Sequence, residues 1–377
     1  MKEGFIRLRN QISRFFYKAV FRPIFFLIDP ETTHRQMMAF GNFLGSNPFT
    51  KALTAFFFSY TNKVLEQKIL GIKFPNPIGL AAGFDKDGVL TDIIPRVGFG
   101  FTEVGSITGD PCQGNPKPRL WRLVKSRGIV VYYGLKNEGC EKILARLKNK
   151  TFAIPIGVSI AKTNSPKTVA VEDGIADYVK AYKKFTNIGS YSTINISCPN
   201  AFGGQPFTDA GRLEALLTEI DKIATGKPLF LKMPPDLDKR KIDRIIEVAK
   251  RHKVAGFICT NLTDDRGNPK IARRITDKNV PKKGGISGKP VEGLANDLIS
   301  YIYRKTNREF VIIGCGGVFS ASDAYKKIKL GASLVQLITG MIFEGPQLIS
   351  EINQGLVDLL KKDGFTNISQ AIGRGVK

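Results

Sequence analysis

Two kinds of hydrophobic pattern divide the chain near residue 66. Before that point apolar residues recur with helical spacing, and after it short continuous apolar runs alternate with amphipathic stretches. The first pattern indicates amphipathic helices, and the second indicates parallel strands that are buried on both faces and joined by helices. We therefore predict an N-terminal helical cap over residues 1–65 and a second domain over residues 66–377.

The first 22 residues carry the clearest helical pattern. Apolar side chains such as Phe5, Leu8 and Ile12 follow the i, i+3, i+4, i+7 spacing, and six basic residues lie between them with a single acid. This predicts a helix with one apolar and one cationic face. Further on, Asp29-Pro30-Glu31 is typical of a helix start, with an N-cap, a proline in the first turn and an acid near the positive end of the helix dipole.

The role of this cap depends on how it meets its surroundings. No apolar run approaches the ~20 residues needed to span a bilayer, and arginines interrupt the apolar run that a signal peptide would need. Twelve of the 26 Phe residues fall in the first 60 positions, which is typical of helices lying in a membrane interface. We expect residues 1–60 to bind an anionic membrane surface. The alternatives are a cap packed on its own domain and a mitochondrial targeting segment, which the near absence of Ser disfavours.

Eight short apolar runs follow the cap, separated by helix-like stretches. Eight such units predict a (β/α)₈ TIM barrel, an α/β fold with its active site at the carboxyl ends of the strands. The predicted strands are residues 77–81, 100–104, 154–160, 191–196, 228–232, 255–259, 310–313 and 332–337.

Composition narrows the classes of function. The formal net charge of +24 suggests nucleic acid, an anionic membrane or an anionic small molecule as a partner. Residues 1–68 hold ten basic and four acidic residues, a net +6, which leaves +18 on the barrel. Two His residues argue against a His-based zinc site or a Ser-His-Asp triad. Five scattered Cys residues argue against a disulfide scaffold or an iron–sulfur site, and they fit a reducing compartment.

Three motifs at the predicted strand ends carry the candidate chemistry. They are Ala81-Ala82-Gly83-Phe84-Asp85-Lys86, Asn195-Ile196-Ser197-Cys198-Pro199-Asn200 and Gly284-Gly285-Ile286-Ser287-Gly288-Lys289. Barrel closure would bring amides, a lysine and a thiol around one mouth. In this combination the chain resembles the dihydroorotate dehydrogenases, flavin enzymes of pyrimidine synthesis, over roughly residues 21–372. The cap motif with His34 resembles the membrane-bound, quinone-reducing class of that family.

The resemblance implies an FMN at the barrel mouth, with Cys198 as the base that removes the C5 proton while a hydride moves from C6 to flavin N5. Lys232 would offset the negative charge of the reduced flavin. The implied FMN contacts are Ala81, Ala82, Gly83, Ser106, Ser159, Asn195, Lys232, Thr260, Ser287, Gly288, Gly316, Gly317 and Thr339. Dihydroorotate and orotate would contact Lys86, Lys136, Asn137, Asn195, Asn200 and Asn261. The remaining thiols are interpreted as structural: Cys112, Cys140, Cys259 and Cys315.

The chain also departs from the family at five positions. Cys198 stands for a usual Ser of the membrane class, and Lys136 and Ser159 stand for usual Asn residues. Leu262 replaces a usual Thr, and Ile338 replaces a usual Tyr. Three alternatives follow: a related FMN barrel acting on another cyclic amide, one acting on tRNA uridine in the manner of a dihydrouridine synthase, and a degenerate flavin-binding scaffold.

The resemblance and the cap together suggest a place in the cell and a set of partners. We expect a peripheral membrane protein on the cytoplasmic face of a bacterial inner membrane, or at the mitochondrial inner membrane in a eukaryote. Its electron acceptor would be a membrane quinone. Neither a nucleic acid partner nor a metal is expected.

Overall fold

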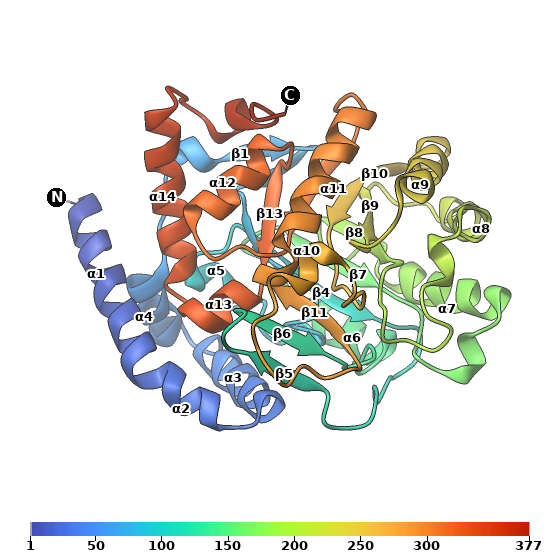
Figure 1. The fold of residues 1–377 in the computed structure, drawn as a ribbon, viewed down its shortest axis with the longest axis horizontal. Coiled ribbons are helices and arrows are strands. Elements are labelled where there is room, and N and C mark those ends of the chain that lie inside the picture. Colours follow the sequence, from blue (N-terminus) through green and yellow to red (C-terminus); the bar gives the residue numbers. More distant parts are fainter. Residues whose placement is uncertain (1, 377) are drawn as a thin grey trace.

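Eight parallel strands close into a barrel in the computed structural model, which describes residues 2–376 (Figure 1). The strand order around the barrel is β10-β12-β13-β3-β4-β7-β8-β9, with β9 pairing back to β10. The predicted TIM barrel is therefore confirmed. The strands are β3 (Ile78–Leu80), β4 (Phe101–Ile107), β7 (Ile156–Ile160), β8 (Tyr191–Asn195), β9 (Leu229–Met233), β10 (Val254–Cys259), β12 (Val311–Cys315) and β13 (Leu334–Leu337).

Each of the eight predicted runs overlaps one of these strands, with ends that differ by a few residues. Helices surround the barrel on the outside (Figure 1). They are α5 (Ile94–Val97), α6 (Cys140–Leu147), α7 (Val171–Lys184), α8 (Ala210–Asp221), α9 (Lys239–Arg251), α10 (Pro269–Ala272), α11 (Glu292–Lys305), α12 (Ala321–Lys329), α13 (Thr339–Glu344) and α14 (Leu348–Lys362).

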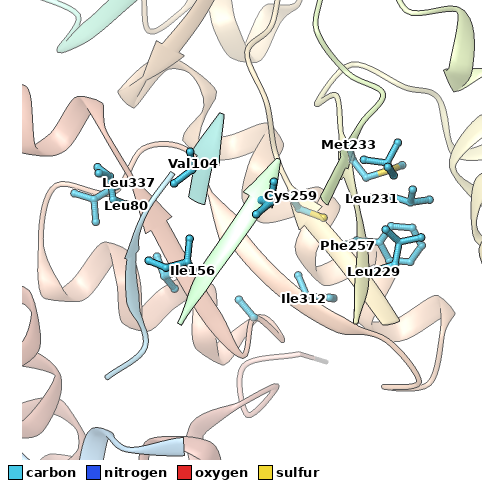
Figure 2. Close-up of a cluster of buried hydrophobic side chains, with 14 of the residues drawn as sticks. Leu80, Val104, Ile156, Leu229, Leu231, Met233, Phe257, Cys259, Ile312 and Leu337 are labelled. Carbon is cyan, nitrogen blue, oxygen red and sulfur yellow. The ribbon is translucent and has the colours of Figure 1, made fainter. Parts of the chain in front are cut away.

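The layer between strands and helices is apolar. Val104, Ile156, Leu231 and Ile312 belong to one continuous buried cluster with residues of the surrounding helices (Figure 2). Cys259 lies in the same cluster and is fully buried, in agreement with a structural role for this thiol. Because parallel strands are covered on both faces, both sides of each strand must be apolar or closely packed, which is why the sequence shows continuous runs rather than alternation.

Aromatic side chains fill the half of the barrel interior that lies at the amino ends of the strands. Phe101, Tyr191 and Phe230 are buried there in one cluster. Glycines on neighbouring strands make room for them, since a Cβ at Gly79 would lie 2.4 Å from the Phe101 ring and one at Gly157 would lie 2.3 Å from the Tyr191 ring. The interior is thus a packed core and not a pore, and the open space is confined to the carboxyl ends of the strands.

Five strands lie outside the barrel, and the sequence pattern did not predict them. β5 (Leu120–Leu123), β6 (Gly128–Val131) and β11 (Gly285–Gly288) form an antiparallel sheet in the order β11-β6-β5. The glycine-rich motif before the seventh predicted strand therefore forms β11. A separate hairpin joins β1 (Gln67–Ile69) and β2 (Ile72–Phe74).

The cap is helical, as predicted. It consists of α1 (Lys2–Phe16), a π-helical turn η1 (Tyr17–Phe21), α2 (Arg22–Leu27), α3 (Pro30–Leu44) and α4 (Pro48–Phe58). The predicted helix start is confirmed, because Asp29 Oδ1 accepts a hydrogen bond of 2.8 Å from the Thr32 N–H at the first turn of α3. Within residues 2–376 no helix has the length and apolarity to cross a membrane.

The two faces of α1 point in opposite directions. Its cations face the barrel, where Arg7 pairs with Asp358 at 2.7 Å and Arg14 pairs with Glu351 at 2.5 Å, both on α14. In the following turn, Lys18 pairs with a carboxylate of α13. These three cations attach the cap to the barrel through partly exposed ion pairs, whereas the sequence suggested that they are directed at lipid. The apolar face stays exposed, and it includes Phe5, Leu8, Ile12, Phe15 and Phe16.

A second attachment of the cap is a buried ion pair. Glu31 on α3 accepts a hydrogen bond of 2.6 Å from Arg119 Nη2, just before β5, and only 15% and 6% of the two side chains are exposed. Arg119 Nη1 also donates to the carbonyl oxygens of Gln113 and Asn115 at 3.0 Å each. The arginine is therefore fully engaged and depends on the cap for its counter-charge.

We predict that Glu31→Gln lowers the free energy of unfolding by about 3 kcal/mol, because it leaves the Arg119 charge buried without a partner. The matched control is Asp358→Asn in the exposed Arg7–Asp358 pair, where we expect a loss of about 1 kcal/mol or less. Urea unfolding of both variants measures the difference. Equal losses would show that the Glu31–Arg119 pair does not hold the cap in the way described.

Candidate active site

A cavity opens at the carboxyl ends of the barrel strands, between the barrel and the cap. Nearly all candidate residues from the sequence line it, although they come from every part of the barrel domain. The candidates in its wall are Ala81, Ala82, Gly83, Lys86, Ser106, Lys136, Asn195, Cys198, Asn200, Lys232, Thr260, Asn261, Ser287, Gly288, Gly316, Gly317 and Thr339.

Two candidates lie outside this wall. Ser159 is fully buried behind it, and its Oγ lies 2.8 Å from Ser106 Oγ. Asn137 is buried in a loop, where its Nδ2 donates to Thr108 Oγ1 at 2.7 Å and its Oδ1 accepts from the Gly139 N–H at 2.8 Å. Because Asn137 is buried and does not line the cavity, we leave it out of the substrate site.

A chain of hydrogen bonds fixes the polar part of the wall. Asn195 Nδ2 donates to Ser106 Oγ at 2.8 Å. Asn261 Nδ2 donates to Ser197 Oγ at 2.9 Å and lies 3.3 Å from Asn195 Oδ1. These contacts join the ends of β4, β8 and β10. The amide groups are therefore held in place by their neighbours, as a binding site for a polar ring requires.

The loop after β8 is tied to the neighbouring sheet. Asn200 Nδ2 donates to the Val131 carbonyl at 2.9 Å, and the Asn200 carbonyl accepts from Asn115 Nδ2 at 3.0 Å. Cys198 is held between these contacts and the end of β8. The thiol is consequently placed on the wall of the cavity by both the barrel and the sheet.

The electrostatic surroundings of Cys198 favour the neutral thiol. Burial raises the pKa of its thiol to about 11, and the backbone N–H of Asn200 and the charges of Lys162 and Lys232 offset only part of that rise. Lys162 is itself engaged, since its Nζ donates to the Phe202 carbonyl at 2.7 Å. At neutral pH, therefore, only a small fraction of Cys198 is the thiolate that can act as a base.

Three lysines line the cavity, and two of them, Lys86 and Lys136, influence each other's charge. Burial lowers the pKa of the Lys86 ammonium to about 8; Asp87 opposes this shift and the charge of Lys136 adds to it. The Lys86 ammonium also lies 4.1 Å from the centre of the Tyr133 ring. Since Lys136 lines the same cavity, a ligand with an anionic group would relieve the repulsion between the two lysines.

The opposite side of the cavity suits a phosphate-bearing cofactor. Gly288 and Gly317 have φ angles of +90° and +75°, and a Cβ on either would lie within 2.5 Å of a neighbouring atom. Only glycine fits there, which brings the backbone close to the cavity. The Ser287 and Thr339 hydroxyls lie 2.8 Å apart beside these glycines. Across the described residues Lys232 has no ion-pair partner, although only 4% of it is exposed. Backbone amides, hydroxyls and an ammonium together fit an anionic cofactor.

The structure also places residues in the wall that the sequence interpretation missed. Leu120, Ile129 and Val131 come from the sheet β5–β6, which was not predicted. Cys315, interpreted from the sequence as structural, lies in the cavity wall at the end of β12. Ile313 faces the barrel interior and side chains on a strand alternate, so Cys315 faces inward too. The continuous apolar run of this strand did not show which of its residues face inward.

A second, apolar cavity lies between the cap and the first one. The two share His34, Phe84, Leu120, Ile129 and Ile342 in their walls. His34 Nε2–H donates to the Phe84 carbonyl at 3.0 Å, and burial lowers the pKa of its ring to about 3, so the ring is neutral. A mostly apolar cavity, with Arg122 as the charged residue in its wall, therefore lies between the cap and the barrel mouth and meets it at a neutral His34. Across residues 2–376 no cluster of three or more His, Cys, Asp or Glu residues is placed to bind a metal.

Comparisons with known proteins agree with one another. A family model described as dihydroorotate dehydrogenase matches residues 64–360. The dihydroorotate dehydrogenase (quinone) of Nostoc punctiforme is 38% identical over 373 residues, which cover 96% of this chain and 98% of that protein. The protein of the same name from Acaryochloris marina is 38% identical over 359 residues, covering 92% and 95%. A crystal structure of DHODH from Eimeria tenella in complex with ferulenol matches with a TM-score of 0.81 at 30% identity, covering 92% and 95%.

The burial of Cys198 leads to a prediction about its reactivity. With a pKa of about 11 instead of 9.0, its alkylation by iodoacetamide at pH 8 should be about 100-fold slower than that of an ordinary thiol, and the rate should still rise above pH 10. Peptide mass spectrometry follows the labelled site, with Cys198→Ala as the blank. A labelling curve that levels off near pH 9 would contradict the electrostatic description.

Proposed function

The chain belongs to the dihydroorotate dehydrogenase family, and from that membership we propose that it oxidises dihydroorotate to orotate and passes the electrons to a membrane quinone. This reaction is a step of pyrimidine synthesis. The observation that carries the proposal is the cavity itself, which gathers Cys198, Lys232, Lys86 and the amides of the β8 and β10 ends in one wall. Family membership favours dihydroorotate over the tRNA uridine considered from the sequence.

The cofactor in this proposal is FMN. When bound, FMN supplies the acceptor for the hydride that leaves C6 of the substrate, and it gains negative charge. Lys232 lies where it can offset that charge, and no carboxylate among the described residues pairs with it. The residues proposed to hold FMN are Ala81, Ala82, Gly83, Ser106, Asn195, Lys232, Thr260, Ser287, Gly288, Gly316, Gly317 and Thr339, with Ser159 supporting Ser106 from behind.

Cys198 is the proposed base. Its Sγ would take the proton from C5 as the hydride leaves C6, so the substrate loses both hydrogens and gains a double bond. Because burial raises the pKa of the thiol to about 11, proton removal depends on the small fraction of thiolate at neutral pH. The rate of oxidation should therefore increase with pH up to the pKa of this group.

Charge and hydrogen bonding would orient the substrate. Lys86 and Lys136 lie in the same wall and are proposed to pair with its carboxylate. The side chains of Asn195, Asn200 and Asn261 each offer a donor and an acceptor, which match the alternating N–H and C=O groups of a pyrimidine ring. All five residues line the cavity.

The route to the quinone is proposed to run through the second cavity. That cavity is lined by cap residues such as Phe25, Phe26 and Met37, and it meets the first cavity at His34. The exposed apolar side chains of the cap belong to the same cap helices, and contact with a bilayer would cover them. We propose a peripheral protein on the cytoplasmic face of a bacterial inner membrane, with the cap dipping into the lipid. The exposed apolar residues of the cap are Phe5, Leu8, Ile12, Phe15, Phe16, Val20, Phe21, Ile24, Leu27, Phe40, Phe43, Phe49, Leu53, Phe56 and Phe57.

One observation favours a second candidate, a related cyclic amide as the substrate. Leu262 lies in the cavity wall and offers no side-chain hydrogen bond, where the family resemblance implies a Thr. Lys136 adds a cation beside Lys86. An unpaired polar group on dihydroorotate opposite Leu262 would cost on the order of 1–3 kcal/mol. A cyclic amide with an apolar group at that position would avoid this cost.

Anaerobic mixing of the flavin-loaded protein with dihydroorotate tests the proposal. The flavin absorbance should bleach, and the rate should rise with pH because more Cys198 is present as thiolate. Cys198→Ala should slow bleaching by about 10²–10⁴-fold, and Cys198→Ser should retain part of the rate. The control is Cys140→Ser, which lies outside the cavity and keeps the hydrogen bond to the Gly109 carbonyl.

Different outcomes overturn different parts of the proposal. Flavin that stays oxidised with dihydroorotate but bleaches with another cyclic amide would transfer the assignment to the second candidate. A fully active Cys198→Ala protein would exclude Cys198 as the base and leave the substrate assignment intact.

A further inference from the structure

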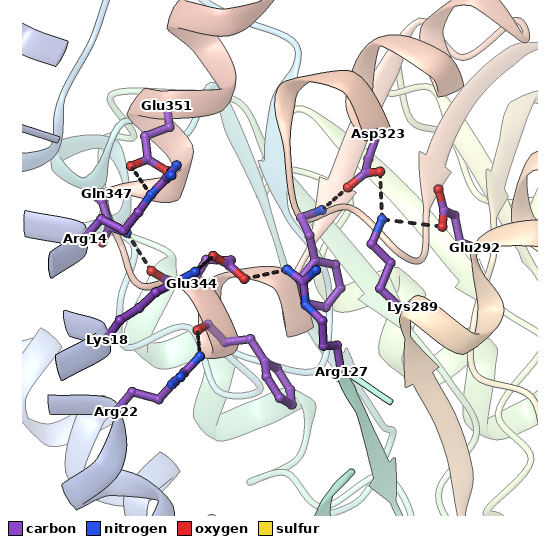
Figure 3. A network of polar contacts seen from close by, with 12 residues as sticks. Arg14, Lys18, Arg22, Arg127, Lys289, Glu292, Asp323, Glu344, Gln347 and Glu351 are labelled. Carbon is purple, nitrogen blue, oxygen red and sulfur yellow. Dashed lines mark hydrogen bonds and ion pairs between the residues drawn. The ribbon is translucent and has the colours of Figure 1, made fainter. Parts of the chain in front are cut away.

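A groove lies on the surface where the cap meets the sheet β5–β6. One wall is formed by Lys18 on η1 and Arg22 on α2, and the other by Lys125 and Arg127 in the turn between β5 and β6. Glu344 of α13 lies between the two walls. The groove has a volume of about 560 Å³, and Figure 3 shows Lys18 and Arg22 on one side of Glu344 and Arg127 on the other.

The charge of this groove is one-sided. Four cations line it together with a single carboxylate, so its net charge is +3. Both oxygens of Glu344 are occupied, one by Lys18 Nζ at 2.6 Å and the other by Arg127 Nη2 at 2.5 Å (Figure 3). These two ion pairs fix the walls relative to each other, and among the described residues neither Arg22 nor Lys125 forms an ion pair with Glu344.

Arg22 and Lys125 are the two groove cations that do not form an ion pair with Glu344. The only hydrogen bond of the Arg22 guanidinium to the described residues is a long one, 3.4 Å from Nη1 to the Phe343 carbonyl. Asp277 lies behind Lys125, where it accepts from the backbone N–H groups of Lys125 and Ser126. In the described part of the chain Lys125 Nζ has no ion pair within 4.0 Å. A guanidinium fork and an ammonium facing one groove form a suitable site for a phosphate group.

The groove also has apolar surroundings. Pro23, Phe26, Val124 and Phe343 line it, and Val124 is exposed. Phe21, Ile24 and Leu27 are exposed on the cap segment that carries Arg22. Phe26 lies in the walls of both the groove and the second cavity. A free phosphate would make no use of these apolar side chains, whereas the acyl chains of a phospholipid would cover them.

We infer that this groove binds the headgroup phosphate of an anionic phospholipid. The site is distinct from the exposed apolar face, because two of its cations come from the barrel domain and not from the cap. Arg7, Arg14 and Lys18 form ion pairs that attach the cap to the barrel. The groove would still supply cations that bind the negative charge of a lipid. It would also hold the entrance of the second cavity at the level of the headgroups. This inference rests on the proposed membrane association.

A soluble short-chain lipid tests the groove without a bilayer. Dihexanoyl phosphatidylglycerol, below its micelle concentration, should bind the full-length protein with 1:1 saturation in calorimetry. The double variant Arg22→Gln/Lys125→Gln should bind about 30-fold more weakly, since each basic residue near anionic lipid contributes about 1 kcal/mol. Dihexanoyl phosphatidylcholine, which has no net charge, should bind much more weakly than the anionic lipid.

The matched control removes the same two charge types on the far side of the molecule. Arg212→Gln/Lys183→Gln changes exposed residues of α8 and α7, away from the cap (Figure 1). It should bind the anionic lipid as the unmodified protein does. An equal loss in this control would reduce the effect to overall charge and overturn the site. Inorganic phosphate binding as tightly as the lipid would show a site for free phosphate and overturn the lipid assignment.

A second readout separates this inference from the proposed reaction. Anaerobic bleaching of the flavin by dihydroorotate, measured without lipid, should be unchanged in Arg22→Gln/Lys125→Gln because neither residue lines the barrel-mouth cavity. If the unmodified protein is not bleached, the reaction assignment fails, while the calorimetry still decides the groove. Loss of bleaching in the double variant with normal lipid binding would contradict the inference.

Discussion

Closure of the eight parallel strands is the constraint on which the site depends. Since all strands point the same way, their carboxyl ends meet at one rim, and residues as far apart as Ala81 and Thr339 share a single cavity. The aromatic core at the amino ends of the strands closes the barrel. There Phe101 and Tyr191 pack against glycines of the neighbouring strands, so the cavity does not continue through the barrel. The polar groups of Ser106, Asn195 and Asn261 can then be ordered by hydrogen bonds to each other.

The cap depends on the barrel for its orientation. Carboxylates of α13 and α14 bind the cations of α1 and η1, so the helix has to turn its apolar face outward. The buried pair between Glu31 and Arg119 fixes α3 against β5 in the same way. An apolar cavity is left between cap and barrel, and it meets the barrel-mouth cavity at His34. In the proposed function, this arrangement would give a polar substrate and an apolar electron acceptor separate approaches to one cofactor site.

Much of the barrel and its mouth could be predicted from the sequence, because the strands appear as local runs of apolar residues. Each strand is a continuous apolar run followed by its functional residue, so the order of residues along the chain is enough to place Lys86, Cys198 and Lys232 at the mouth. The sheet β5–β6–β11 could not be predicted, since β11 pairs with β6 about 155 residues earlier in the chain, a contact that no local pattern records. The outward face of α1 was also ambiguous, because a cationic face suits lipid and carboxylate alike. Asn137 shows the limit of motif matching, since it is buried and does not line the cavity.

The central claim is that substrate and quinone reach one flavin from two connected cavities. Ile342 lies in the wall of both, so Ile342→Trp should obstruct the passage between them. Stopped-flow absorbance can measure the two half-reactions separately, reduction of the flavin by dihydroorotate and its reoxidation by a quinone. We predict that reoxidation slows by roughly tenfold or more while reduction stays nearly unchanged. Equal slowing of both half-reactions, or unimpaired reoxidation by the quinone, would contradict the claim.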